Sequence, residues 1–130
     1  MSTPYTIVNL FDDVANSVGD DFPGIEGHFA RRHLDSDHLG VSYFRYAPGV
    51  RAAVGHRHRE QEEAYVVVGG SGRMKLDDEV RELRRWDVVR VSPAVVRAVE
   101  AGDEGVELIA IGSDRPEGGD GVSVPVDWPD

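Results

Sequence analysis

Two histidines open the stretch of sequence that decides the fold, Gly55-His56-Arg57-His58-Arg59-Glu60-Gln61-Glu62-Glu63, which continues as Ala64-Tyr65-Val66-Val67-Val68-Gly69-Gly70. On an extended chain His56 and His58 point to the same face, because side chains alternate along a strand. Glu63 begins the apolar run and can return a carboxylate to the two imidazoles. Divalent metals accept imidazole and carboxylate ligands. The stretch therefore predicts a polar or metal site between two strands.

Short apolar segments, each ended by Gly, Pro or Asp residues, recur along the rest of the chain. We expect strands at 5–10, 28–34, 39–47, 63–68, 73–76, 80–83, 88–91, 95–100 and 106–111. Turns are expected at 69–72 and 101–105, one helical turn at 13–18, and an irregular tail at 112–130. No segment keeps a helical apolar spacing over three turns. The sequence predicts an all-β protein, either a sandwich, a jelly roll or a small barrel.

Composition narrows the classes of function. The 130 residues suit one domain, and the net charge of −10, from 14 basic and 24 acidic residues, argues against nucleic acid or anionic membranes as partners. The absence of cysteine excludes disulfides, a thiolate metal site and a cysteine nucleophile. We find neither a signal-peptide pattern nor an apolar run of about 18 residues, so we expect a cytoplasmic protein.

The spacing of His56, His58, Glu63 and Gly70 resembles the first cupin motif, in which two histidines one residue apart are followed by a glutamate and a glycine. Residues 48–83 resemble small single-domain bacterial cupins of the mannose-isomerase-like kind. The resemblance covers roughly 41–111 and implies a double-stranded β-helix, or jelly-roll barrel, in a homodimer. It implies one domain over 1–130, with an N-terminal extension at 1–40, a barrel core at 41–112 and a tail at 113–130. It also implies His56, His58 and Glu63 as metal ligands.

The second motif of that family departs from its usual pattern in this chain. Its histidine, normally the last metal ligand, corresponds to Arg97, and its two glycines correspond to Trp86 and Ala94. Arginine has no lone pair to donate and adds a positive charge near the expected metal. Three readings stay open: Arg97 pairs with Glu63 and no metal binds; three ligands hold a metal while Arg97 turns to an anionic substrate; or these are core groups without a ligand. A bound metal would be zinc, iron, manganese, nickel or copper.

Further side chains are candidates for contact with a small-molecule ligand. Tyr65 shares a strand face with Glu63, and Tyr43 shares one with Arg45. We expect Tyr43, Arg45, Tyr65 and Arg97 to contact the ligand, with ordinary core packing as the alternative for the tyrosines. The expected function is binding or conversion of a small anionic metabolite in the barrel pocket. The alternatives are a metal-dependent oxygenase or isomerase that uses the two histidines and Glu63, and a purely structural dimer.

Overall fold

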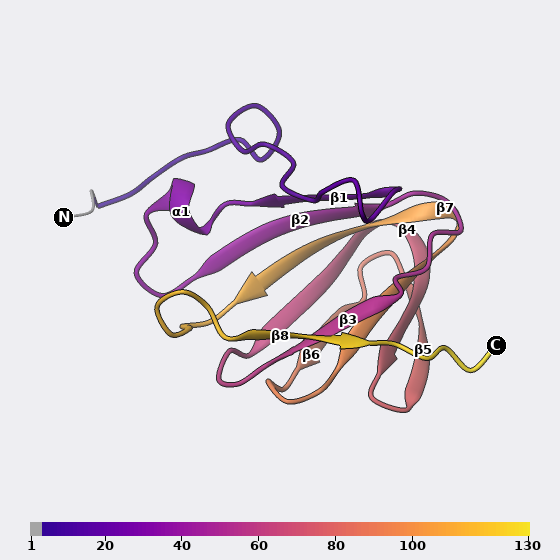
Figure 1. Ribbon diagram of the computed structural model, residues 1–130. Helices are drawn as coiled ribbons and strands as arrows, with labels where there is room; N and C mark the ends of the chain where they lie inside the picture. The colour runs from indigo at the N-terminus through magenta and orange to yellow at the C-terminus, as the bar shows by residue number, and fades with distance from the viewer. Residues whose placement is uncertain (1–3) are drawn as a thin grey trace.

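The computed structural model describes residues 4–130, and its regular elements are strands apart from one short helix (Figure 1), so the prediction of an all-β fold is confirmed. The first three residues of the predicted extension at 1–40 lie outside the described residues. In chain order the elements are β1 (Ile25–Phe29), α1 (Arg31–Leu34), β2 (Gly40–Tyr46), β3 (Val54–His58), β4 (Glu63–Leu76), β5 (Glu79–Arg84), β6 (Val88–Val91), β7 (Arg97–Gly112) and β8 (Gly121–Pro125).

The eight strands form one curled sheet, and the two longest strands, β4 and β7, run through both halves of it. The first half of β4 pairs with β6 and with the second half of β7, whose other edge pairs with β2 and then β1. The second half of β4 pairs with β5 and with the first half of β7, which meets β3 and then β8. All these pairings are antiparallel. Side chains from both halves of the sheet form one buried cluster, which includes Val67, Met74, Val99 and Leu108.

Glycines let β4 bend between the two halves of the sheet. The register between β4 and β7 shifts between Val67 and Gly69 and again between Gly70 and Gly72, which marks β-bulges. Gly70 has a φ of 65°, and a Cβ there would clash with the carbonyl oxygen of Gly105, whose own φ is 82°. The predicted turns at 69–72 and 101–105 are therefore wrong, because the same glycines here bend a continuous strand.

The N-terminal third differs most from the sequence prediction. The predicted strand at 28–34 is β1 up to Phe29, after which the chain turns into the single helical turn α1. Residues 5–10 form no strand and residues 13–18 form no helix. Asn16 instead makes an isolated β-bridge with His28, and its side chain accepts a hydrogen bond from the backbone of Gly27. The segment lies beside β1 in Figure 1.

The tail is more ordered than its glycines and prolines predict. β8 pairs with β3 over five residues, from Val54–Pro125 to His58–Gly121. Trp128 then donates its indole N–H to the carbonyl of Ala52 over 2.8 Å and lies against the guanidinium of Arg51. The prediction of an irregular tail is thus wrong for 121–125. Over residues 4–130, no helix is both long and apolar enough to cross a membrane.

Candidate functional site

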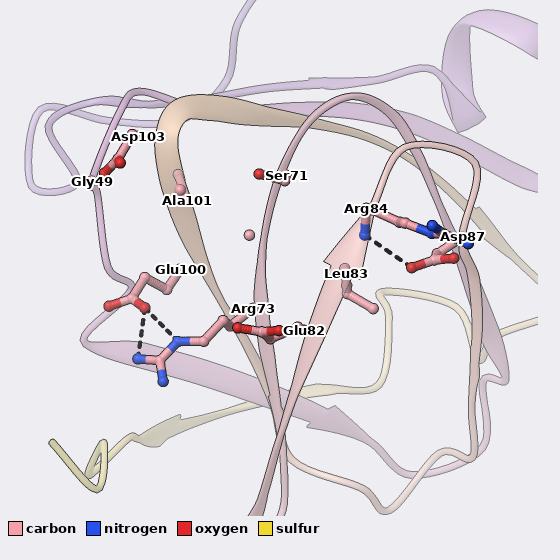
Figure 2. A pocket seen from close by; sticks show the side chains of 12 residues that line it. Gly49, Ser71, Arg73, Glu82, Leu83, Arg84, Asp87, Glu100, Ala101 and Asp103 are labelled. Carbon is pink, nitrogen blue, oxygen red and sulfur yellow. Dashed lines mark hydrogen bonds and ion pairs between the residues drawn. The ribbon is translucent and has the colours of Figure 1, made fainter.

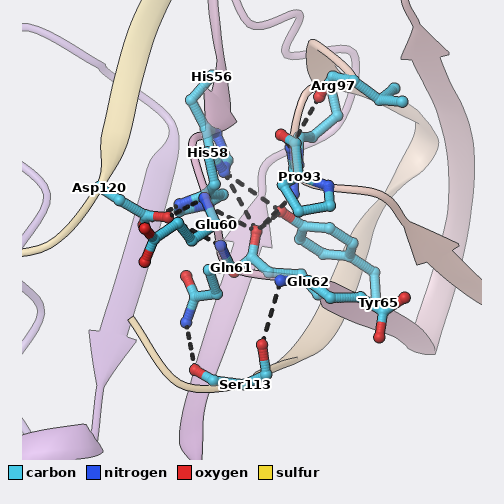
Figure 3. Close-up of polar contacts among 12 residues, drawn as sticks. His56, His58, Glu60, Gln61, Glu62, Tyr65, Pro93, Arg97, Ser113 and Asp120 are labelled. Carbon is cyan, nitrogen blue, oxygen red and sulfur yellow. Dashed lines mark hydrogen bonds and ion pairs between the residues drawn. The ribbon is translucent and has the colours of Figure 1, made fainter. Parts of the chain in front are cut away.

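Three side chains from β3 and β4 converge at one end of the barrel interior, and we call them the His–His–Glu group (His56, His58 and Glu63). The Nε2 atoms of His56 and His58 lie 3.4 and 3.1 Å from Oε1 of Glu63 (Figure 3). One possible ligand atom from each residue lies within 4.8 Å of the other two. Strand alternation brings the histidines to one face, as the sequence predicts, and β4 begins with Glu63 facing them.

Two further donors reach the same carboxylate oxygen. The hydroxyl of Tyr65 donates to Oε1 of Glu63 over 2.8 Å, and Nη2 of Arg97 donates to it over 3.1 Å. Burial by itself would raise the pKa of Glu63, but hydrogen bonds from His56, His58 and Tyr65 outweigh burial and hold that pKa well below its usual range. Burial and the charge of Glu63 raise the pKa of Tyr65, which keeps its hydroxyl protonated as a donor.

Arg97 lies inside the barrel with only 2% of its surface exposed. The register between β3 and β7 places it directly across from His56. Its Nη1 donates to the carbonyls of Pro93 and Val95, at 3.2 and 2.7 Å. The structure thus brings the guanidinium to the His–His–Glu group as an ion-pair partner of Glu63.

Asp120 is a member of this site that sequence reasoning missed. Its Oδ1 lies 2.8 Å from Nδ1 of His58, and its Oδ2 accepts hydrogen bonds from the backbone N–H groups of Glu60 and Gln61. Burial opposes ionisation of Asp120, but these donors lower its pKa to about 2. The hydrogen bond to Glu63 raises the pKa of His58; burial opposes this shift, and the hydrogen bond to Asp120 adds to it. Asp120 fixes the imidazole with Nε2 toward Glu63.

An Asp120→Asn variant is expected to lose about 1–3 kcal/mol of unfolding free energy at pH 7, because buried donors lose a charged acceptor. Folding lowers the pKa of Asp120 from 3.8 to about 2, so its contribution is present above pH 3.8 and is lost as the pH falls toward 2. Urea unfolding between pH 7 and about pH 3 should show that the difference in unfolding free energy between wild type and Asp120→Asn narrows as the pH falls. The exposed Asp114, changed to Asn, is the control; an equal loss there would contradict the prediction.

The structure places Tyr43 and Arg45 on the other face of β2, away from the His–His–Glu group. The hydroxyl of Tyr43 donates to Glu107 over 2.6 Å, and its ring packs against Phe11. The alternate residue Phe44 instead lines the pocket above the group. Sequence alternation identifies the two faces of this strand but does not tell which of them is internal.

A pocket of about 480 Å³ opens above the His–His–Glu group. Tyr65, Phe29 and Phe44 form part of its wall, and the two phenylalanine rings meet edge to face at 5.3 Å. Three arginines that the sequence analysis did not single out, namely Arg31, Arg32 and Arg115, also line it. Two of them, Arg31 and Arg32, come from α1, where the sequence predicted a strand. Only their positive charge could have identified the three arginines as candidates from the sequence.

A larger hollow of about 720 Å³ lies elsewhere and is lined by residues of β4, β5 and β7 (Figure 2). Arg73 and Glu100 point into it and form an ion pair at 2.7 Å, and Asp130 also contacts Arg73. Because these charged groups satisfy one another, the smaller pocket with its partly uncompensated arginines is the better candidate for ligand binding.

Comparison with known proteins decides the family. The family model described as the cupin domain matches residues 42–112, which is more than half of the chain. This chain belongs to the cupin family. The matched segment contains the whole His–His–Glu group, Tyr65 and Arg97, whereas Arg31, Arg115 and Asp120 lie outside it. No curated protein matches this cupin significantly in sequence.

Solved structures confirm the cupin fold. A sugar phosphate isomerase from a cupin superfamily, from Silicibacter pomeroyi DSS-3, is 17% identical with a TM-score of 0.72, over 90% of this chain and 80% of that one. A cupin protein from Bacteroides fragilis is 20% identical with a TM-score of 0.70, over 88% of each chain. A variant of Bacillus subtilis oxalate decarboxylase is 21% identical with a TM-score of 0.69, over 84% of this chain and 30% of that one. At these identities the likeness shows the fold alone.

Proposed function

We propose that this cupin binds a small anionic metabolite in the pocket above the His–His–Glu group. The observation that supports the proposal most is the presence of Arg31, Arg32 and Arg115 around that pocket, in a chain whose net charge is −10. A guanidinium offers paired N–H donors that match the oxygens of a carboxylate or a phosphate. The arginines give an otherwise acidic molecule a local site for an anion.

Arg31 is held in place by the backbone around it. Its Nη2 donates to the carbonyl of Ser113 over 2.7 Å. Gly40 pairs with Gly112 across β2 and β7, and a Cβ at Gly40 would clash with the guanidinium of Arg31. Burial and then the charge of Arg115 lower the pKa of Arg31. An anion bound between the two arginines would relieve their repulsion, which supports this position for the ligand.

The size and walls of the pocket also suit a metabolite. Its volume of about 480 Å³ lies within the usual range of small-molecule sites, about 300–1,000 Å³. Phe29 and Phe44 offer apolar contact, and Ser42 also lines the pocket. A ligand can therefore place an anionic group on the arginines and its remaining atoms against the aromatic wall.

Arg31→Ala is expected to weaken binding of an anionic probe about 10- to 100-fold, because a hydrogen bond to a charged group contributes about 1.5–3 kcal/mol. Isothermal titration calorimetry with inorganic phosphate and with glucuronate checks this, and binding should weaken as salt is added. Arg81→Ala removes an exposed arginine of β5 outside the pocket and is the matched control. The proposal fails if wild-type protein binds neither probe, or if both variants lose the same affinity.

A metal-dependent conversion, by an oxygenase or an isomerase, is the second candidate function, and the donor geometry favours it. Two imidazole nitrogens and a carboxylate oxygen lie close together, and Asp120 leaves Nε2 of His58 facing them, so the donor set fits one divalent ion with three protein ligands. A bound ion would supply Lewis acidity, and iron, manganese, nickel or copper would also permit redox chemistry. The residues of the chain would hold the ion, while Tyr65 keeps a proton at the base of the pocket.

A homodimer is also proposed, through the outer face of β2, β4, β6 and β7. Val41, Ala64 and Ile111 form one cross-strand row there, and Val66, Ile109 and Val88 form the next. Ile111 and Val88 are 41% and 64% exposed in the single chain, and such a patch is typical of an interface. Light scattering after gel filtration should give the mass of a dimer for wild type and that of a monomer for Ile111→Glu.

The single-domain division and the cytoplasmic location stay predictions.

A further inference from the structure

The turn between β5 and β6 holds a tryptophan in a backbone conformation that usually requires glycine. The backbone N–H of Asp87 donates to the carbonyl of Arg84 over 3.0 Å, which closes a four-residue turn with Trp86 at its third position. Trp86 is the one residue of this turn with a positive φ, which is 75°. A positive φ at the third position alone is that of a type II turn, where glycine is preferred because a Cβ is unfavourable there.

Further hydrogen bonds hold this turn in place. Oδ2 of Asp87 accepts a hydrogen bond from the backbone N–H of Arg84 over 2.9 Å. The backbone N–H of Trp86 donates to the carbonyl of Val67 over 2.7 Å, and the N–H of Val67 donates to the carbonyl of Asp87 over 3.0 Å. Two residues of the turn thus oppose one residue of β4, which is the arrangement of a β-bulge. Trp86 therefore keeps its unfavourable conformation, and it destabilises the single chain relative to glycine at the same place.

The indole of Trp86 gains little from the chain that carries it. The residue is 63% exposed, and its ring lies 4.9 Å from the guanidinium carbon of the neighbouring Arg85. A side chain that strains its own backbone and yet stays in water is explained when a partner buries it. Tryptophan and arginine are also the residue types most enriched among the energetically dominant residues of protein interfaces. The turn therefore presents an aromatic side chain for contact with another molecule.

The position and charge of the turn favour a second copy of this chain as that molecule. Trp86 precedes Val88 by two residues, and Val88 is the first residue of β6 and belongs to the apolar face that we assign to the homodimer. Arg84 and Arg85, both exposed, come directly before Trp86 in the chain. Because every copy has a net charge of −10, two arginines at the edge of the interface favour contact with another copy.

We propose that Trp86 is the anchor residue of the homodimer, with its indole buried against the second copy. The stability that the turn loses in the single chain is then recovered on association. The inference rests on the dimer of the proposed function and goes beyond it, because it names the residue whose conformation lowers the stability of the monomer and raises the affinity of the dimer. Twofold symmetry places two such indoles in one interface.

Two substitutions at this position separate the strain from the contact. Trp86→Gly and Trp86→Ala both remove the indole, and each should weaken dimerisation at least about 100-fold, since every dimer loses two anchor side chains. Only glycine also relieves the turn, so Trp86→Gly should melt about 3–6 °C above Trp86→Ala. Sedimentation equilibrium and calorimetry measure the two quantities. Phe22→Ala removes another exposed aromatic side chain, before β1, and should dimerise as wild type does.

Fluorescence reports on the indole itself, because the chain contains two tryptophans. In a Trp128→Phe variant the emission comes from Trp86 alone, and it should move to shorter wavelength as rising protein concentration drives association. A dimer with unchanged emission, or one that both Trp86 variants form as tightly as wild type, overturns the inference and leaves the proposed dimer intact. A wild-type protein that stays monomeric overturns both. Equal melting temperatures of the glycine and alanine variants overturn the assignment of strain to the turn.

Discussion

A Glu63→Gln variant is expected to lose about 3–5 kcal/mol of unfolding free energy at pH 7, the cost of removing one partner of a buried ion pair. Oε1 of Glu63 accepts hydrogen bonds from Tyr65 and Arg97 and faces both histidines, and Arg97 is nearly inaccessible to solvent. The amide retains an oxygen but not the charge, so the guanidinium is left buried without a counter-ion. Urea unfolding followed by circular dichroism measures the loss.

Glu62→Gln is the matched control for this prediction. Glu62 is the neighbouring residue, and its carboxylate is exposed and pairs with Arg90 at 3.0 Å, so its loss should cost less than about 1 kcal/mol. If both variants lose the same free energy of unfolding, the buried pair of Glu63 and Arg97 stabilises the protein no more than an exposed pair does, which contradicts the prediction. Combining Glu63→Gln with Arg97→Met should cost clearly less than the sum of the single changes, because the buried charge is then also removed.

The pH dependence of this effect has a definite sign. The pKa of Glu63 in the folded protein lies below its ordinary value of 4.5. Its contribution is therefore complete above pH 4.5 and is lost as the pH falls further below that value. The difference in unfolding free energy between wild type and Glu63→Gln should narrow as the pH falls below 4.5. The corresponding difference for Glu62→Gln should stay small at every pH.

Arg97→His is expected to raise the affinity for a divalent metal at least 100-fold. The change removes a positive charge and adds an imidazole at the position where the family usually supplies one. A single charge about 5 Å from a dication, at an effective dielectric constant of about 20, is repelled by about 6–7 kcal/mol, and rearrangement of the guanidinium would reduce that figure. Zn²⁺ titration of metal-free protein, with metal content measured by elemental mass spectrometry, checks the prediction.

Arg90→His controls for the mere addition of a histidine, since Arg90 is exposed and lies on the outer face. It should bind metal no better than wild type does. The double change of His56 and His58 to alanine should abolish binding in either background. Unchanged affinity in a correctly folded Arg97→His variant would show that the guanidinium does not limit metal binding at the His–His–Glu group.

Part of this site could be predicted from local residue patterns. Alternation along a strand places His56 and His58 on one face wherever β3 lies. The apolar run after Glu63 predicts that the next strand begins there, as β4 does. The same alternation failed for β2, because both of its faces carry aromatic residues. The register that pairs Phe44 with Leu108, and Tyr43 with Ile109, decides which face is internal.

The sequence by itself determined the all-β class, the cupin resemblance and the closeness of His56, His58 and Glu63, because all of these depend on period and short spacing. Only the tertiary structure decided that Asp120 supports His58 from 62 residues away, and that Arg31 and Arg115 face the same pocket. It also decided that Arg97 lies buried against Glu63 rather than turned to solvent. These contacts depend on how β7, β8 and α1 close around the barrel. Burial and register, which are properties of the whole chain, select them, and local residue patterns do not encode them.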